Sequence, residues 1–188
     1  LNDQEKGLSF KLEGPLDMRM DQDNPTTCEN LLNKANFNQL DRIIKEYGEE
    51  PFHRRIAMAI VEKRRERRIK TTTELVNIII GALPYKRRHL RIHPATRTFM
   101  ALRIAVNNEL ENLEVALSKI FDCISFLSRV CVISFHSLED RIVKNKFKEL
   151  KEKEIVRILT KKPLIPVYSE IISNPRARSA KLRVAEKI

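Results

Sequence analysis

The stretch RVCVISFHSLEDRIVKNKFKELKEKE, residues 129–154, decides the fold class. It begins with an apolar, β-branched run of the kind found in strands that are covered on both faces. A helix follows at once, with Ser137 as its predicted N-cap and Asp140 as the acid at its third position. Shorter apolar segments at 156–160 and 181–188 predict two more strands around a proline-containing loop. This order of elements is typical of the end of an α/β domain.

The residues before this strand have a helical pattern, because apolar side chains recur at helical spacing between residues 26 and 83. Caps and first-turn residues predict helix starts at Thr27, Asn36, Pro51 and Thr71 or Thr72. Since the polar joints between these helices are short, we expect a compact helical lobe. Residues 1–25 have the glycine and proline content of a loop, and residues 96–124 read as one long helix or two abutting ones.

The composition indicates the class of partner. The chain has 188 residues, enough for one domain or for a domain with a smaller inserted lobe. Its 36 lysines and arginines exceed its 25 acidic residues, which gives a net charge of +11. This excess indicates a polyanionic partner, and charge alone leaves RNA, DNA and an anionic membrane open.

The cysteines and the first residues indicate the compartment. Cys28, Cys123 and Cys131 form no CxxC pair, and an odd number argues against a secreted disulfide framework. The opening LNDQEKGLSF has neither the regions of a signal peptide nor an initiator methionine. We therefore expect reduced thiols in a cytoplasmic compartment, no membrane anchor, and a chain that is a fragment or a processed product.

His136 is the sharpest candidate for contact with a substrate. The apolar strand delivers it to the carboxyl edge where ligands bind in open α/β sheets, and the next helix begins there with free N–H groups. The alternative is that Ser137 and Asp140 are merely a capping pair and that His136 is a turn residue. Spacing alone leaves both interpretations open.

Two pairs of arginines are candidates for phosphate contacts. Arg97 and Arg103 lie on the helix after His93-Pro94, and Arg176 and Arg178 lie at a loop-to-strand junction. A solvated helix face explains the first pair equally well, and a basic tail is the alternative for the second. We expect the clusters EKRRERR and YKRRHLR to follow a nucleic-acid backbone.

Metal and cofactor motifs are missing from the sequence. His53, His89 and His93 have no metal-ligand spacing with a cysteine, so we predict no metal site. The four glycines form neither GxGxxG nor GxxxxGK. The sequence therefore offers no glycine loop to cradle a phosphate or a cofactor.

Seven motifs in register carry a resemblance to a known family. They are, in chain order, GLSF with GPLDMRMD, EYGEEPFHRRIAMAIV, TTTEL, HPATRTFMALRIAVNNEL, VISFHSLEDRIVK, LTKKP and NPRARSAKLRVAEK. Together they resemble, almost end to end, the ribosomal RNA small-subunit methyltransferase H family of the MraW type. The resemblance implies an S-adenosylmethionine-dependent enzyme that methylates the exocyclic N4 of a cytosine in the decoding region of bacterial small-subunit ribosomal RNA.

The resemblance also implies a domain layout. Residues 1–25 and 93–188 would belong to a class I Rossmann-like methyltransferase core, and residues 26–92 to an inserted helical lobe that recognises RNA. In the family the cofactor-binding residues lie upstream of the position equivalent to Leu1. We therefore expect an N-terminally truncated chain that lacks the first four strands of the sheet, in which RVCVISF would be the fifth.

Two positions depart from the family pattern. Met100 stands where the family usually has Gln, which puts a possible polar contact in doubt. Phe126-Leu127-Ser128 replaces a Pro-Gly-Gly turn before the strand, which puts the tightness of that turn in doubt.

We expect the residues of this chain to bind the RNA substrate. The candidates are Arg97, Arg103, Arg176 and Arg178 for phosphates, and Asn107 and His136 for the vicinity of the base. The expected partner is small-subunit ribosomal RNA or the assembled small ribosomal subunit. The competing hypothesis is a non-catalytic remnant that grips this RNA but binds no cofactor. A basic helical DNA-binding protein is a third and weaker hypothesis, because the match of all seven motifs would then be a coincidence.

Overall fold

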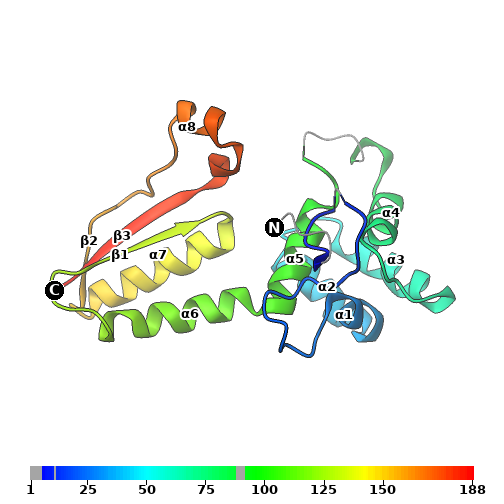
Figure 1. The fold of residues 1–188 in the computed structure, drawn as a ribbon, viewed down its shortest axis with the longest axis horizontal. Helices are drawn as coiled ribbons and strands as arrows, with labels where there is room; N and C mark the ends of the chain where they lie inside the picture. The colour runs from blue at the N-terminus through cyan, green and yellow to red at the C-terminus, as the bar shows by residue number, and fades with distance from the viewer. Residues whose placement is uncertain (1–5, 11, 88–91) are drawn as a thin grey trace. The chain divides into compact units, whose positions relative to one another are not determined.

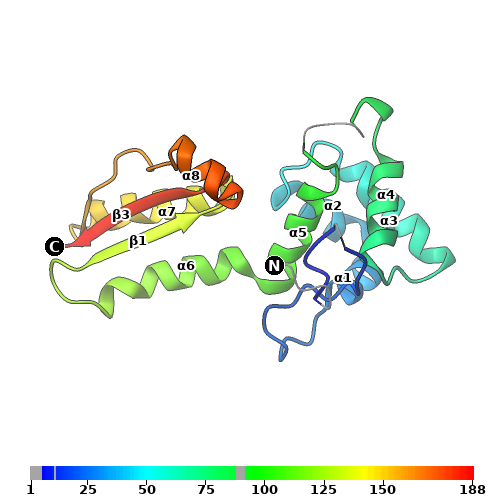
Figure 2. The same cartoon turned by 45° about the horizontal axis from the view of Figure 1, so that its top comes forward.

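The structure is a computed structural model that describes residues 6–10, 12–87 and 92–188. The chain divides into two compact units, Leu1–Glu109 and Leu110–Ile188, and each is described by itself. Figures 1 and 2 show helices in the first unit and a small sheet with helices in the second. Leu1-Asn2 and the part of the basic connector at 88–91, which includes His89, lie outside the described residues.

The first unit is built from helices. They are α1 (Cys28–Lys34), α2 (Phe37–Glu46), α3 (His53–Glu66), α4 (Thr72–Ala82) and α5 (Thr96–Asn107), with a 3-10 turn at Tyr85–Arg87 before α5. The side chains of Thr27, Asn36 and Thr71 accept first-turn amide N–H groups and cap α1, α2 and α4. The predicted starts of these three helices are confirmed, whereas α3 begins at His53, just beyond Pro51.

Helices α1 to α5 share one core. Its buried apolar side chains include Leu32, Leu40, Ile44, Ile56, Ile60, Leu75, Ile79, Phe99 and Leu102, and Leu16 and Met18 join them from the segment before α1. The first compact unit extends to Glu109, because α5 buries Phe99 and Leu102 in the helical core. The domain bounds 1–25, 26–92 and 93–188 stay a prediction. Membership of a methyltransferase core stays a prediction.

The run at 96–124 contains two abutting helices, as one of the two alternatives predicted. Helix α5 ends at Asn107 and α6 (Glu109–Lys119) begins after Asn108, whose backbone is left-handed with φ 49° and ψ 38°. Asparagine tolerates this conformation better than most residues. None of the described helices combines the length and the apolar content that crossing a membrane requires.

The second unit contains a three-stranded sheet in the order β1-β3-β2. The strands are β1 (Arg129–Ser134), β2 (Val156–Ile158) and β3 (Lys181–Lys187). Because β3 is antiparallel to both outer strands, β1 and β2 run parallel to each other and are joined through α7 (Ser137–Glu152). Helix α8 (Tyr168–Ser173) and a 3-10 turn at Pro175–Ser179 precede β3. The three predicted strands and a mixed α/β fold class are confirmed.

The expectation that β1 is covered on both faces is wrong for the described residues. Helix α7 covers one face, where Val143 and Phe147 pack in a buried cluster with Ala185. On the other face Ile133 is 58% exposed, and Cys131 is exposed as well. Burial therefore alternates along β1, as it does in a half-covered strand, although the sequence of the strand is continuously apolar.

Candidate functional site

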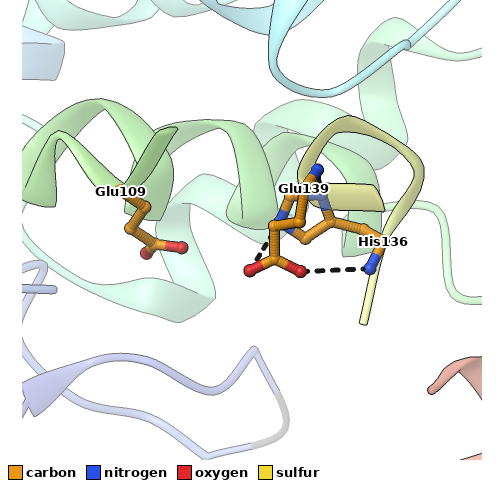
Figure 3. A group of neighbouring side chains, drawn as sticks. All are labelled: Glu109, His136 and Glu139. Atoms are coloured by element: carbon orange, nitrogen blue, oxygen red, sulfur yellow. Dashed lines mark hydrogen bonds and ion pairs between the residues drawn. The ribbon is translucent and has the colours of Figure 1, made fainter. Parts of the chain in front are cut away.

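The start of α7 carries a specific local geometry. His136 is the N-cap, and its Nδ1 accepts the amide N–H of Glu139 at 3.4 Å. In return, Oε2 of Glu139 accepts the amide N–H groups of Phe135 and His136 at 2.8 and 3.3 Å. Figure 3 shows the two side chains facing each other at the helix start. This reciprocal arrangement is a capping box, and it holds the imidazole in one orientation.

The cap also selects the tautomer of His136. An Nδ1 that accepts a hydrogen bond leaves the ring proton on Nε2, and Nε2 lies 3.4 Å from Oε1 of Glu139. The side chain of His136 is only 10% exposed. An imidazole N–H beside a carboxylate can donate a hydrogen bond, and contact between His136 and a substrate stays a prediction.

The predicted capping pair of Ser137 and Asp140 is wrong by one residue, because His136 and Glu139 form the cap. The carboxylate of Asp140 turns toward β3 instead. Its Oδ1 accepts the Nε–H of Arg183 at 2.7 Å, and its Oδ2 lies 3.3 Å from Nζ of Lys181. The hydrogen bond from Arg183 is the main cause that lowers the pKa of Asp140.

The basic residues near the end of the chain fall into two groups. Arg176 and Arg178 lie on the 3-10 turn before β3, where the side chain of Asn174 accepts the amide N–H of Arg176 at 3.2 Å. The side chain of Arg178 is exposed. Lys181 and Arg183, by contrast, bind Asp140. The 3-10 turn therefore carries an exposed positive charge at Arg178 that a ligand can contact.

An arginine organises the segment before α1 in the first unit. Nε and Nη2 of Arg19 each donate to an oxygen of Asp17 at 2.8 Å. Its Nη1 donates to the main-chain carbonyls of Gln22 and Asn24 at 2.8 and 2.9 Å. The side-chain hydrogen bond from Arg19 is the main cause that lowers the pKa of Asp17. One guanidinium thus fixes the turn from Asp17 to Asn24.

Asn107 fastens this turn to α5. Its Oδ1 accepts the amide N–H of Met20 at 2.7 Å, and its Nδ2 donates to the carbonyls of Met18 and Arg103 at 2.8 and 2.9 Å. Met18 has a φ of 61°, which a residue other than glycine adopts only where its surroundings hold it. Asn107 is therefore a positioning residue for the turn, and its contact with a base stays a prediction.

The two candidate arginines of α5 have different environments. Arg103 forms a bidentate pair with Glu109, with Nε and Nη2 at 2.7 and 2.9 Å from the carboxylate oxygens. Arg97 is exposed, and its Nη1 donates to the main-chain carbonyl of Glu49 at 2.9 Å. Because a carbonyl carries no net charge, this bond orients Arg97 without neutralising it.

The structure brings only some of the predicted site residues together. Asn107 meets the GPLDMRMD segment, but His136 belongs to the other unit, so a joint contact of both with one base stays a prediction. Arg19 and Glu139 were not predicted as organising residues from the sequence. Both can be recognised from local spacing: Asp17 lies two residues before Arg19, and Glu139 is the third helical residue after His136.

Gly7, Gly14 and Gly48 serve turns and close contacts in the first unit, whereas Gly81 has open space around it. A Cβ at Gly7 would lie 1.8 Å from the carbonyl oxygen of Pro15, and a Cβ at Gly48 would lie 2.6 Å from that of Ile44. Gly14 donates its N–H to Oγ1 of Thr72 at 3.1 Å, and Gly81 lies inside α4. The described residues therefore do not fit S-adenosylmethionine as a glycine cradle, and we assign no cofactor-binding residue among them.

Comparisons with known proteins converge on one family. A profile described as the MraW methylase family matches residues 1–188. A protein of Persephonella marina named ribosomal RNA small subunit methyltransferase H is 52% identical over 184 residues, which are 98% of this chain and 63% of that protein. Proteins of the same name from Sulfurihydrogenibium azorense and Trichlorobacter lovleyi are 51% and 46% identical, over 97% and 100% of this chain and 62% and 65% of their own lengths. The chain thus spans about 63% of the length of the first of these relatives.

Proposed function

The chain belongs to the MraW methylase family, and we propose that it acts in S-adenosylmethionine-dependent methylation of a cytosine N4 in the decoding region of bacterial small-subunit ribosomal RNA. The observation that carries this proposal is the family match over residues 1–188, together with relatives whose name states ribosomal RNA methylation. The net charge of +11 supports an RNA substrate, because phosphate contacts supply much of the affinity for nucleic acid.

The chemistry of methyl transfer to a cytosine amino group determines what the protein must provide. S-adenosylmethionine supplies the methyl group on a sulfonium centre. The amino nitrogen of cytosine is a poor nucleophile because its lone pair is delocalised into the ring, so alignment and nearby polar groups must provide most of the rate. The cytosine must also be unstacked or presented in a loop before it enters a pocket. We assign the presentation of the RNA to the residues of this chain.

The proposed RNA contacts follow from exposure and charge. Arg97 and Arg178 are exposed and are the first candidates for phosphates. Arg103 would have to exchange Glu109 for a phosphate, and we expect it to contribute less than Arg97. Arg176 is proposed as a further phosphate contact beside Arg178. Asn107 and His136 are proposed to lie near the base.

We also propose the architecture that the resemblance implies. The second unit would be the C-terminal part of a class I Rossmann-like sheet, and residues 26–92 would be the inserted lobe that recognises RNA. In support, β1 and β2 run parallel and are joined through α7, which is the connection of a βαβ unit. The small ribosomal subunit is the proposed partner and the cytoplasm the proposed compartment, since the three cysteines are free thiols.

The net charge of +11 also favours a second candidate function, a non-catalytic module that binds ribosomal RNA. Calorimetry of the purified chain with S-adenosylmethionine separates the two. Micromolar binding would contradict the module, and it would also contradict the expectation that the cofactor-binding residues lie outside this chain. RNA affinity without binding of S-adenosylmethionine would favour the module.

Methyl transfer tests the leading proposal directly. The chain is incubated with small ribosomal subunits from a strain that lacks the modification and with methyl-labelled S-adenosylmethionine, and the labelled nucleotide is located by mass spectrometry. The expected label is on N4 of one cytosine in the decoding region. Label on another nucleotide would refute the proposed substrate, and labelling of DNA in preference to RNA would refute the substrate class.

A further inference from the structure

A small cavity in the first unit lies where three segments meet. It has a volume of about 110 Å³ and is lined by the start of α3, the turn after α4 and the start of α5. The lining residues that carry the argument are Glu50, Phe52, Arg87, His93 and Arg97. They come from three separate sequence motifs, EYGEEPFHRR, YKRRHLR and HPATRTF. The structure brings polar and charged groups of all three to one place.

Arg97 is held at the rim of this cavity by the backbone of the turn after α2. A Cβ on Gly48 would lie 2.9 Å from the carbonyl oxygen of Arg97, so α2 and α5 approach each other closely there. The next residue, Glu49, has a φ of 45° and accepts the Nη1–H of Arg97 through its main-chain oxygen at 2.9 Å. A guanidinium has five N–H donors, so Arg97 can still bind an anion at the cavity.

Arg87 is oriented by an aromatic ring. Its Cζ lies 5.7 Å from the centroid of the Phe52 ring, which is a cation–π contact. A cation–π contact acts through the positive charge of the guanidinium. Arg87 is exposed, so its donors are accessible from solvent.

The other groups at the cavity leave an excess of positive charge. Glu50 is 7% exposed, and its Oε1 accepts the amide N–H of Phe52 at 2.9 Å, so its carboxylate has a structural task at the start of α3. His93 stacks on Phe10 at 4.6 Å between ring centroids, and its Nδ1 accepts the amide N–H of Ala95 at 3.2 Å. Among the described residues that line the cavity, two guanidiniums therefore stand against one carboxylate. A small anion is the ligand that fits this set.

We propose that the cavity between Phe52, Arg87 and Arg97 binds one backbone phosphate of an RNA strand. Its size suits a single phosphate group, and arginine forks match phosphate oxygens bidentately. The identification of the anion as RNA, rather than a free nucleotide, rests on the proposed function. The cavity assigns Arg87, Phe52 and His93 to RNA binding and makes Arg97 part of a two-arginine site.

The salt dependence of RNA binding tests this site. The affinity of the chain for a single-stranded cytosine-containing 20-nucleotide RNA is measured at several salt concentrations for the wild type, Arg87→Gln, Arg97→Gln and the double variant. Each phosphate contact contributes about 0.7 to the slope of log affinity against log salt for a single strand. Because both arginines hold the same phosphate, the double variant loses about 0.7 in total and binds about tenfold more weakly at low salt. A loss of about 1.4, or no loss, would overturn the site.

A matched control removes the effect of net charge. Lys148→Gln removes one positive charge, as each single arginine variant does, from an exposed position on α7, where Lys148 lies 3.7 Å from Glu152, and it should leave the slope unchanged. If Lys148→Gln lowers the slope as much as the double variant does, the effect is one of net charge and the site is refuted. Circular dichroism checks that all variants are folded.

Competition distinguishes the source of the phosphate. Cytidine monophosphate and inorganic phosphate should displace the RNA only at millimolar concentrations, whereas micromolar displacement would show a nucleotide site and overturn the backbone assignment. The binding assay needs neither S-adenosylmethionine nor methyl transfer. Binding with the expected slopes but without methylation would remove methyl transfer by this chain and leave the phosphate site. Methylation without these slopes would leave methyl transfer and remove the phosphate site.

Discussion

Nε of Arg183 lies 2.7 Å from Oδ1 of Asp140, and this pair joins β3 to the first turn of α7. The two side chains are only 9% and 13% exposed. The pair therefore connects the strand in the middle of the sheet with the helix that begins beside His136. It explains why Asp140 serves the packing of the second unit, whereas its neighbour Glu139 serves the helix cap.

Asp140→Asn should destabilise the second unit by about 2 kcal/mol, because it leaves the guanidinium of Arg183 buried without a counter-charge. Urea unfolding followed by circular dichroism measures the change. Glu114→Gln, on the exposed surface of α6, is the control and should stay within about 0.5 kcal/mol of the wild type. Equal stabilities for the two variants would show that the Asp140–Arg183 pair contributes nothing.

Acid should weaken the contribution of the same pair. The folded state holds the pKa of Asp140 below its ordinary value of 3.8, so the carboxylate binds fewer protons in the folded than in the unfolded chain. Its stabilisation is complete above that value and is lost as the pH falls through the lower, folded pKa. The difference in unfolding free energy between wild type and Asp140→Asn should shrink below about pH 4. A difference that is constant from pH 7 to pH 2 would contradict this.

Asn107→Ala should release the turn from Asp17 to Asn24, because Met20 loses its acceptor and Met18 its donor. We expect a loss of about 2 kcal/mol and faster hydrogen exchange of the Met20 amide. Asn107→Asp retains the acceptor but not the donor, so its stability should lie between those of the wild type and Asn107→Ala.

Asn77→Ala is the control for Asn107, since Asn77 is exposed on α4 and its replacement should leave exchange at Met20 unchanged. Should Asn107→Ala leave the exchange rate of Met20 as it is in the wild type, the turn is held by other contacts.

The two helix-associated glycines should respond in opposite directions to alanine. At Gly48 the new Cβ would lie 2.6 Å from the carbonyl oxygen of Ile44 and 2.9 Å from that of Arg97, so Gly48→Ala should cost about 2 kcal/mol or more. At Gly81 nothing lies within 4 Å of the new Cβ, and Gly81→Ala should stabilise α4 by about 0.5 to 1 kcal/mol. Thermal unfolding of both variants checks the contrast, which a destabilised Gly81→Ala would refute.

Variants of His136 should distinguish its role in capping α7 from a role in methyl transfer. His136→Ala removes the cap of α7 and should cost about 1 kcal/mol, whereas asparagine is a good N-cap and His136→Asn should keep most of the stability. If His136 contacts the base, His136→Asn loses methyl transfer despite its stability. Retained transfer by His136→Asn would limit His136 to its capping role. Unfolding curves and transfer rates of both variants decide between these outcomes.

The helices and strands were predictable because their signals are local. Thr27, Asn36 and Thr71 cap helices within three residues of themselves, and apolar spacing reports on one element at a time. The coverage of β1 was not predictable in this way. A continuous apolar run is compatible with two covered faces, and only the packing of α7 shows that one face of the described strand is open.

The candidate site was less predictable, because its partners are distant in sequence. Asn107 binds Met20, which is 87 residues away, and Arg183 binds Asp140, which is 43 residues away. No periodicity or spacing rule connects such positions. The predicted cap differs from the observed one by one residue because serine is a preferred N-cap and histidine is not.

The sequence by itself determined the order of the elements, the excess of positive charge and the family, since each follows from residue identity along the chain. Only the tertiary structure decided which charges are available. Arg103 and Arg183 are neutralised by carboxylates, whereas Arg87 and Arg97 stand at a cavity with their donors accessible. The physical reason is that the interaction of two charges depends on their separation and burial, and packing sets both.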